Sequence, residues 1–423
     1  MTACLQAQDF GGPSVLSRGG AAAGTRGGAP INFVYYGGFN GIYTHGAVPL
    51  TGGPSSNKVN LYGASFEFGL TGSHLWRRSM MGIDYRGNFR YDNNTSYQNG
   101  SDHALSLYYS MRPSKSTQLL LSETATSSSF AFGNYTAAAG ATTDFIGVPL
   151  TDIFDSRVYS TQSTASFSFR QSRTIAYQVV GQAFKIYRSN ANLVGVNGGQ
   201  ASAYIRYAPT RRIVASVGYI YNYYSFPRAF GNSNANGVSL SLNWKPTRGW
   251  TFGGSIGAYR VESTGVQTVT LIPEIADLLG VPTSIRSIHN IQNAFSGSAL
   301  ASYSYRRSNF TVQYSQGLSP GNGIYLTSNL RTFNVGYSYS GLRKLSVSVN
   351  AGYDHYDSVF QDLNTYGSYQ AGFTLNYSLR PHIYLTSTAD FRNFSITQGQ
   401  SRIGTAVSIG VLLSPSRLPL PAW

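Results

Sequence analysis

Short basic segments recur along the chain at a spacing that two long β-strands and one loop would fill. The segments begin at residues 75, 112, 170, 209, 245, 306, 341, 379 and 414. Six of the eight intervals between these starts are 35 to 39 residues long, and the other two are 58 and 61. A membrane-spanning β-strand needs about 9–11 residues, whereas strands in soluble proteins average about 5–6. The spacing is therefore typical of long hairpins with short turns at one end and longer loops at the other.

Residues between the basic segments alternate between apolar and polar side chains, which is the pattern of a strand with two different faces. In 369–380, Tyr369 and Phe373 share one face, and Gln370 and Thr374 share the other. The chain is 14% aromatic but only 11% charged, against about 25% charged in an average soluble domain. A soluble β-sandwich also alternates, but its strands are usually shorter. The high aromatic content excludes a disordered chain. The sequence also lacks a run of about 20 apolar residues for a membrane-spanning helix.

We therefore predict an all-β fold, a closed antiparallel transmembrane β-barrel over residues 31–413, with short periplasmic turns and long extracellular loops. Closure is required because an open sheet edge in lipid would leave backbone groups without hydrogen bonds. About 18 strands are expected, with 16 as the alternative, and either even number puts both ends of the barrel on the periplasmic side. The expected strands are 31–43, 57–70, 79–92, 101–113, 115–126, 156–170, 173–188, 197–209, 211–224, 234–246, 248–261, 293–307, 308–318, 327–341, 342–356, 365–380, 381–395 and 400–413. The longest expected loops are 126–155 and 262–292.

The segments on either side of the barrel have different compositions. Residues 1–30 are rich in Gly and Ala, and we interpret them as a signal-peptide remnant of about eight residues followed by a flexible leader. An unstructured start without a targeting role and a lipidated Cys4 are the alternatives. Cys4 is the single cysteine, which excludes a disulfide framework. Residues 414–423 form a Pro-rich C-terminal tail.

This architecture resembles that of bacterial outer-membrane β-barrels of porin-like size. The resemblance rests on the periodic hairpins, the aromatic residues near strand ends, the single short-turn side and the terminal aromatic residue Trp423. Pro415, Pro419 and Pro421 separate Trp423 from the last expected strand, so we do not expect Trp423 to end that strand. The resemblance implies an outer-membrane location, with membrane lipid and lipopolysaccharide as the surroundings. Monomer and trimer are both compatible with it.

The net charge of +15 is concentrated at the short turns, which argues against nucleic-acid binding and for contact with anionic headgroups of the inner leaflet. A subset has a sharper interpretation, because its members end downward strands on the polar, lumen-facing side. Such a set predicts a ring of cations at the periplasmic mouth, which would favour anions. The predicted ring consists of Arg112, Arg170, Lys245, Arg306 and Arg380. Outward rotation of these long side chains to the headgroups is the alternative.

A second group of charges falls on lumen-facing positions of strands that barrel closure would bring together. This predicted lumen charge cluster consists of Glu67, Asp84, Arg86, Arg90, Asp390 and Arg392. We expect it either to shape a constriction or bind a charged solute, or to hold the wall together by salt bridges. Lys185 and Arg260 instead fall on lipid-facing positions near the upper strand ends, unless a bulge reverses the alternation there.

The sequence gives no sign of an enzyme, a cofactor or a metal site. Residues 253–257 match the G-x-S-x-G pattern, but they lie in an alternating strand rather than at a strand-to-helix turn. The six histidines show no metal-binding spacing. Residues 270–280 predict one short amphipathic helix within the longest loop.

The expected function is that of a porin-like channel for passive diffusion of hydrophilic solutes, with a preference for anions. An exopolysaccharide export barrel for an acidic polymer is the first alternative, and it predicts loops 126–155 and 262–292 folded into the lumen. A non-conducting structural or adhesive barrel is the second, and it predicts a plugged lumen.

Overall fold

Long strands make up almost all of the described part of the chain. The computed structural model describes residues 31–46, 60–93, 99–128, 157–189, 193–270, 283–321, 326–342, 344–359, 366–396, 400–414 and 418–420. The strands are β1 (Ile31–His45), β2 (Asn60–Leu75), β3 (Ser79–Asp92), β4 (Gly100–Met111), β5 (Thr117–Ser128), β6 (Val158–Arg170), β7 (Ile175–Arg188), β8 (Val196–Tyr207), β9 (Ile213–Phe226), β10 (Gly231–Trp244), β11 (Trp250–Thr270), β12 (Thr283–Tyr305), β13 (Ser308–Ser319), β14 (Ser328–Tyr339), β15 (Leu345–Ser358), β16 (Tyr366–Arg380), β17 (Ile383–Ile396), β18 (Gln400–Leu413) and the short β19 (Leu418–Leu420).

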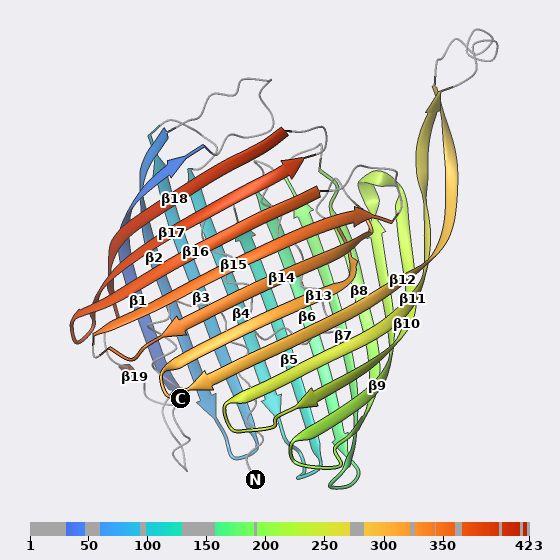
Figure 1. Ribbon diagram of the computed structural model, residues 1–423, viewed down its shortest axis with the longest axis horizontal. Coiled ribbons are helices and arrows are strands. Elements are labelled where there is room, and N and C mark those ends of the chain that lie inside the picture. The colour runs from blue at the N-terminus through green and yellow to red at the C-terminus, as the bar shows by residue number, and fades with distance from the viewer. Residues whose placement is uncertain are drawn as a thin grey trace.

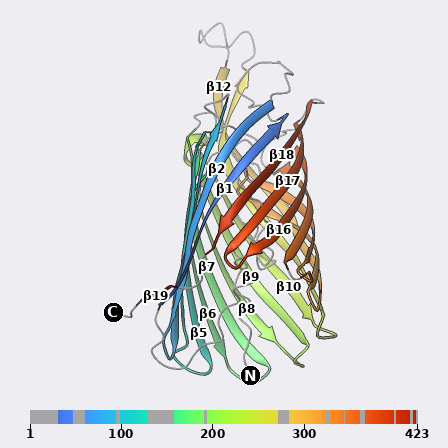
Figure 2. The same ribbon diagram turned by 90° about the vertical axis from the view of Figure 1, so that its left-hand side faces the viewer.

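The first eighteen strands form one closed antiparallel barrel. Each pairs with the next along the chain, and β1 pairs with β18 from Gly37↔Leu413 to His45↔Thr405, which closes the ring. In Figure 1 the strands from β10 to β18 form the wall nearer the viewer, and Figure 2 shows β1 and β2 beside β18. β19 adds three residues of pairing to the start of β1. The predicted fold class and its eighteen strands are confirmed, and the sixteen-strand alternative is wrong.

One predicted loop is largely strand. β11 and β12 are 21 and 23 residues long and pair as far as Thr270↔Thr283, inside the segment 262–292 expected to be a loop. They form a ribbon that projects beyond the rest of the barrel (Figure 1). The β-branched residues of Thr264–Thr270 favour this extended structure. The predicted leader, the interior of loop 126–155 and most of the predicted helix 270–280 lie outside the described residues.

Within the described ranges, no helix is long and apolar enough to cross a membrane. The single helical element described is the 3₁₀ turn η1 (Pro227–Ala229), which links β9 to β10.

The two faces of the barrel wall differ in chemistry. On β10, the large side chains of Val238, Leu240 and Leu242 are exposed on the outer face, whereas Ser239 is buried on the inner face. This alternation places apolar side chains toward lipid and small polar ones toward the interior. Rings gather on the outer face at the short-turn end, where Trp250 stacks on Phe252 with centroids 5.3 Å apart. The outer face therefore has the apolar band and aromatic girdle of a membrane-spanning barrel.

Apolar side chains also fill part of the interior, at the long-loop end. Leu326, just before β14, packs with a cluster of residues from β6 to β9 that includes Ile186 and Phe226. Leu318, near the end of β13, packs with Ile220 of β9 and Val261 of β11. The two ends of the β13–β14 connection therefore pack against the inner face of β6 to β11 and fill the loop end on that side.

Candidate functional site

Paired hydroxyl groups line much of the inner wall. The hydroxyl oxygens of Ser255 and Ser298 are 2.7 Å apart across β11 and β12. Those of Thr388 and Ser408 are 2.7 Å apart across β17 and β18. Hydroxyls that bond to each other across strands leave an uncharged, water-compatible surface. The G-x-S-x-G serine is one of these residues: Ser255 lies within β11 with its hydroxyl toward Ser298, rather than at a turn.

The residues of the predicted lumen charge cluster do not all lie together. Closure brings β17, β18, β1, β2 and β3 side by side, as expected. On β3, Arg86 and Asp84 form a two-pronged ion pair with N–O distances of 2.8 and 3.1 Å. Each charge of this pair is satisfied within β3, so the pair joins no two strands of the wall.

Glu67 belongs to a chain of polar side chains that come from β2, β1 and β17. Asn40 of β1 donates an amide hydrogen bond of 2.9 Å to Oε1 of Glu67, and the Thr386 hydroxyl lies 3.4 Å from Oδ1 of Asn40. Gly410 of β18 lies between Asn40 and Thr386 in the register. A Cβ atom on Gly410 would lie 1.9 Å from Oδ1 of Asn40, so the contact requires glycine there.

Arg90 lies near two carboxylates without a direct ion pair to either among the described residues. Its charge interacts with those of Glu67 and Asp92, yet its Nε is buried without a hydrogen bond. Asp92 is 2% exposed, and both of its carboxylate oxygens are buried without a hydrogen bond within the described ranges. The inner face of β3 thus carries negative charges at Asp84 and Asp92 and positive charges at Arg86 and Arg90 between them, with the upper part less satisfied than the lower.

Asp390 and Arg392 are separate from this column. Their positions can be compared on β18, which lies between the two groups. Asp390 of β17 lies opposite Ala406 of β18. Glu67 of β2 lies opposite Gly38 of β1, which lies opposite Leu412 of β18, six positions from Ala406. Six positions correspond to about 20 Å along a strand. Asp390 has Arg392 as its nearest charged neighbour, and Arg392 is buried. The predicted cluster therefore divides into a β2–β3 column and a β17 pair.

The five predicted ring residues are all exposed at the short-turn end, but they are not equivalent. The backbone N–H groups of Arg112, Arg170 and Lys245 continue the strand pairing, with hydrogen bonds of 2.7, 2.7 and 2.8 Å. Continued pairing keeps the inward alternation of their strands. Arg306 has a φ of 50° and lies over the outward-facing ring of Tyr305, 5.2 Å from its centroid. Arg380 follows a register irregularity in β16, between Ser378 and Arg380.

The filled loop end contains a residue that the sequence analysis missed. Arg188, the last residue of β7, is 1% exposed and donates a short hydrogen bond of 2.5 Å to the carbonyl of Val194. Its charge lies near Tyr356 of β15, on the opposite wall. The alternation of β7 places Arg188 on the inner face with Phe184 and Ile186, which was the available signal. The neighbour across the lumen could not be found from sequence, because Tyr356 lies on β15, a strand that does not pair with β7.

Lys185 and Arg260 face outward, as the alternation predicts. The β6–β7 register is continuous from Val158↔Arg188 to Arg170↔Ala176, so no bulge reverses Lys185. Arg260 forms an ion pair of 3.0 Å with Glu262.

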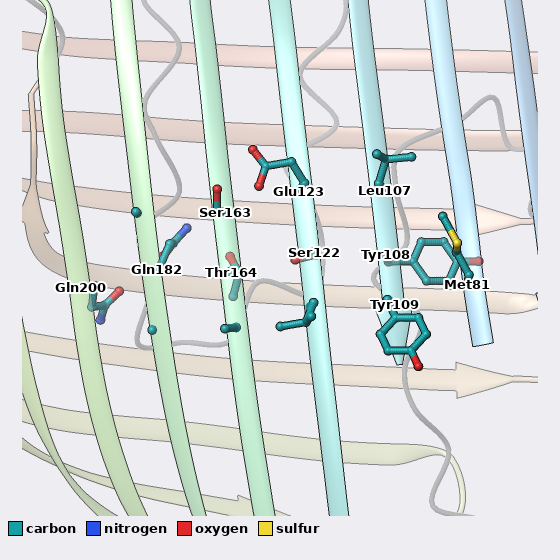
Figure 3. Close-up of a pocket in the computed structure, with 14 residues that line it drawn as sticks. Met81, Leu107, Tyr108, Tyr109, Ser122, Glu123, Ser163, Thr164, Gln182 and Gln200 are labelled. Carbon is teal, nitrogen blue, oxygen red and sulfur yellow. The ribbon is translucent and has the colours of Figure 1, made fainter. Parts of the chain in front are cut away.

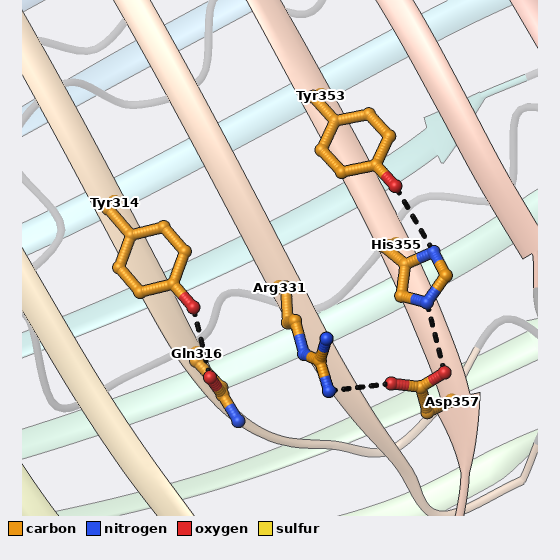
Figure 4. Close-up of polar contacts among 6 residues, drawn as sticks. All are labelled: Tyr314, Gln316, Arg331, Tyr353, His355 and Asp357. Carbon is orange, nitrogen blue, oxygen red and sulfur yellow. Dashed lines mark hydrogen bonds and ion pairs between the residues drawn. The ribbon is translucent and has the colours of Figure 1, made fainter.

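The outer face has two further features. A shallow pocket of about 560 Å³ lies over β3 to β8 (Figure 3), and its lining includes the outward-facing Met81, Leu121 and Glu123. Near the loop end, Arg331 and His355 both contact Asp357, at 3.2 and 3.0 Å, while Tyr353 lies 3.3 Å from His355 (Figure 4). Nowhere in the described ranges do three His, Cys, Asp or Glu residues form a group that could hold a metal ion.

Comparison with known proteins identifies only distant structural neighbours. The chain matches no protein-family model, and no curated protein matches its sequence. Among solved structures it is similar to the outer membrane protein OpdK from Pseudomonas aeruginosa, with a TM-score of 0.45, 12% identity, and coverage of 90% of this chain and 99% of that one. It is also similar to Acinetobacter baumannii OccAB4, with a TM-score of 0.42, 9% identity, and coverage of 92% and 99%.

The membrane assignment rests on the chain's own strand pairing and surface. A closed wall of eighteen strands leaves no unpaired sheet edge around the ring, and its outer face is apolar and aromatic. The protein is an integral β-barrel of a bacterial outer membrane.

Proposed function

We propose that the barrel is a porin-like channel for passive diffusion of hydrophilic solutes. The observation that carries the proposal is the inner wall, where cross-strand hydroxyl pairs such as Ser255–Ser298 alternate with apolar residues on the outside. Polar groups of this kind stay solvated only if the interior holds water. A barrel of this strand number is wide enough to enclose an aqueous path unless a segment fills it.

The path is proposed to follow the inner face of β1 to β5. Apolar packing of Leu318 and Leu326 occupies the loop end against β6 to β11. The inner wall from β1 to β5 instead carries Asn40, Glu67, Ser106 and Thr124, with the last two hydroxyls 3.5 Å apart. A solute moving along this side would exchange hydrogen bonds with water for hydrogen bonds with the wall.

The proposed anion preference depends on the short-turn mouth. The described charges of the inner column and the β17 pair are nearly balanced, because Glu67, Asp84, Asp92 and Asp390 oppose Arg86, Arg90 and Arg392. Arg112, Arg170 and Lys245 are the cations whose backbone geometry best supports an inward direction. Exposed cations at a mouth raise the local anion concentration, more strongly at low salt.

Swelling of proteoliposomes in neutral sugars of increasing size tests the channel proposal. We expect swelling that falls steadily with sugar size, because passive diffusion through a wet pore is limited by its cross-section. Liposomes that hold folded, heat-modifiable barrel and do not swell in the smallest sugar would contradict the proposal.

A non-conducting structural or adhesive barrel is the second candidate, and one observation favours it. The apolar packing around Leu326 and the buried Arg188 fill part of the interior at the loop end. If this filling extended across the whole lumen, the swelling experiment would give no signal. The export barrel has less support, since the β11–β12 ribbon projects away from the barrel rather than into it.

A further inference from the structure

The upper part of the β2–β3 column has polar groups that lack partners. Glu67 accepts one hydrogen bond, from Asn40, and forms no ion pair within the described part of the chain. Asn88, directly opposite Glu67 in the register, has its Oδ1 buried without a hydrogen bond. Arg90 is the next inward-facing residue of β3, and its Nε is also buried without a hydrogen bond. A carboxylate acceptor, a neutral amide acceptor and a cationic donor thus lie side by side without full pairing.

The spacing of these groups suits a ligand with two charges. Residues directly opposite across strands have Cβ atoms about 5 Å apart, and diagonal neighbours about 7–8 Å apart. Glu67 and Asn88 are opposite, and Glu67 and Arg90 are diagonal. Arg90 and Glu67 are close enough for their charges to interact but do not form an ion pair. A small molecule that reaches both would replace the missing contacts.

We propose that Glu67, Asn88 and Arg90 form a subsite for zwitterionic solutes, such as amino acids with separated charges. The solute's ammonium group binds the carboxylate of Glu67 and the side-chain Oδ1 of Asn88, and its carboxylate binds the guanidinium of Arg90. Supplying partners to buried polar groups removes an unfavourable free energy, which favours the bound state. The proposal rests on the proposed function, because the solute reaches this site through the lumen.

Asp92 sets the expected order of affinities. It lies beyond Arg90, and Asp102 lies opposite Asn88 on the inner face of β4, so Glu67, Arg90, Asp92 and Asp102 together carry a net charge of −2. A cation is therefore attracted and an anion repelled, whereas a zwitterion satisfies both signs. The expected order of affinity is zwitterion, then cation, then anion.

The test is calorimetric binding of three matched probes to the refolded barrel in detergent: 4-aminobutyrate, butylammonium and butyrate. We expect 4-aminobutyrate to bind about tenfold or more tightly than butylammonium, with butyrate weakest, since a charge-assisted hydrogen bond corresponds to roughly that factor. Equal affinities for the three probes, or tightest binding of butyrate, would overturn the subsite.

Variants identify the residues. Glu67→Gln and Arg90→Gln should each weaken 4-aminobutyrate binding about tenfold or more. The same changes on the outer face, Glu123→Gln and Arg260→Gln, should leave affinity within about twofold. The exchange variant Glu67→Arg with Arg90→Glu should recover binding, which a merely structural role would not produce. Unchanged affinity in folded Glu67→Gln would overturn the assignment, and if that variant does not fold, the probe series on the native chain decides.

Proteoliposome swelling on the same preparations separates the two proposals. A barrel that admits sugars but shows no zwitterion preference contradicts the subsite and leaves the channel intact. A barrel that binds 4-aminobutyrate with this preference but admits no sugar contradicts the channel and leaves the subsite intact.

Discussion

Single glycines determine where several inner-wall side chains lie. The ring of Tyr108 lies over Gly82, and Asn40 reaches across Gly410, in both cases within 2 Å of where a glycine Cβ would be. A ring lying flat over a cross-strand glycine stabilises the sheet and keeps the side chain close to the wall. Glycine at these positions therefore serves both the stability of the wall and the free cross-section of the lumen.

Gly410→Ala should destabilise the barrel by about 1–3 kcal/mol, because the new methyl group meets Asn40 and the backbone oxygen of Phe39. Urea unfolding in phospholipid vesicles measures the change. Gly336→Ala is the matched control, since nothing lies within 4 Å of a Cβ there. A Gly410→Ala barrel as stable as Gly336→Ala would show that the Asn40 contact is not required.

The cations at the short-turn mouth give a second prediction at this scale. Changing Arg112, Arg170 and Lys245 together to Gln should move the reversal potential toward the cation side, most strongly at low salt, because exposed charges are screened as salt rises. Arg306→Gln should have little effect, because its guanidinium lies over Tyr305 on the outer face. An equal shift from Arg306→Gln would argue that all mouth cations act alike.

The β13–β14 connection is the element that most changes the interior. Both of its ends are buried against the inner face of β6 to β11, through Leu318 and Leu326. Loops of large barrels that fold inward narrow the lumen, and this one does so on one side. The export-barrel alternative predicted this role for loops 126–155 and 262–292, but the β11–β12 ribbon extends outward instead.

Leu326→Ala should cost about 2–5 kcal/mol, because it leaves a cavity among Ile186, Val196 and Phe226. Leu342 is 51% exposed and lies in the turn between β14 and β15. Leu342→Ala should change stability by about 0.5 kcal/mol or less. Guanidinium unfolding of both variants measures this difference. A Leu326→Ala barrel no less stable than Leu342→Ala would mean that the connection is not packed against the wall.

The strands and their neighbours could be predicted because a strand's alternation is a local signal. The basic turns predicted about eighteen strands, and closure then placed β17, β18, β1, β2 and β3 side by side in that order. Contacts across the lumen could not be predicted, since they join residues such as Leu326 and Ile186 that no strand pairing connects. The charge cluster was predicted as one group but divides along the strands, because alternation shows which face a residue is on and not the register between neighbouring strands.

At the scale of the whole molecule, the outer face determines how the barrel sits in the membrane. Leu240 is 55% exposed on the outer face of β10. Along the strand it lies between Trp244, in the girdle at the short-turn end, and Asn236, whose Oδ1 accepts a hydrogen bond from the Tyr219 hydroxyl. These polar and aromatic groups mark the two interfaces, and Leu240 lies in the apolar band between them. The outward-facing Lys185 and Arg260 belong to the upper part of this face.

Leu240→Arg should therefore cost about 2–4 kcal/mol of folding free energy in a phospholipid bilayer, as expected near the midplane. Tyr223→Arg, near the loop end, should cost about 0–1 kcal/mol. Reversible unfolding from vesicles gives both values. Equal costs at the two positions would place the membrane elsewhere on the barrel.

The central claim is that the polar interior conducts water-soluble solutes, and single-channel current across a planar bilayer tests it most directly. Purified, refolded barrel under a salt gradient should give steady openings, with a reversal potential on the anion side set by the mouth cations. A reversal on the cation side would contradict the anion preference and leave the channel intact. Silence from folded, heat-modifiable barrel would contradict the channel itself.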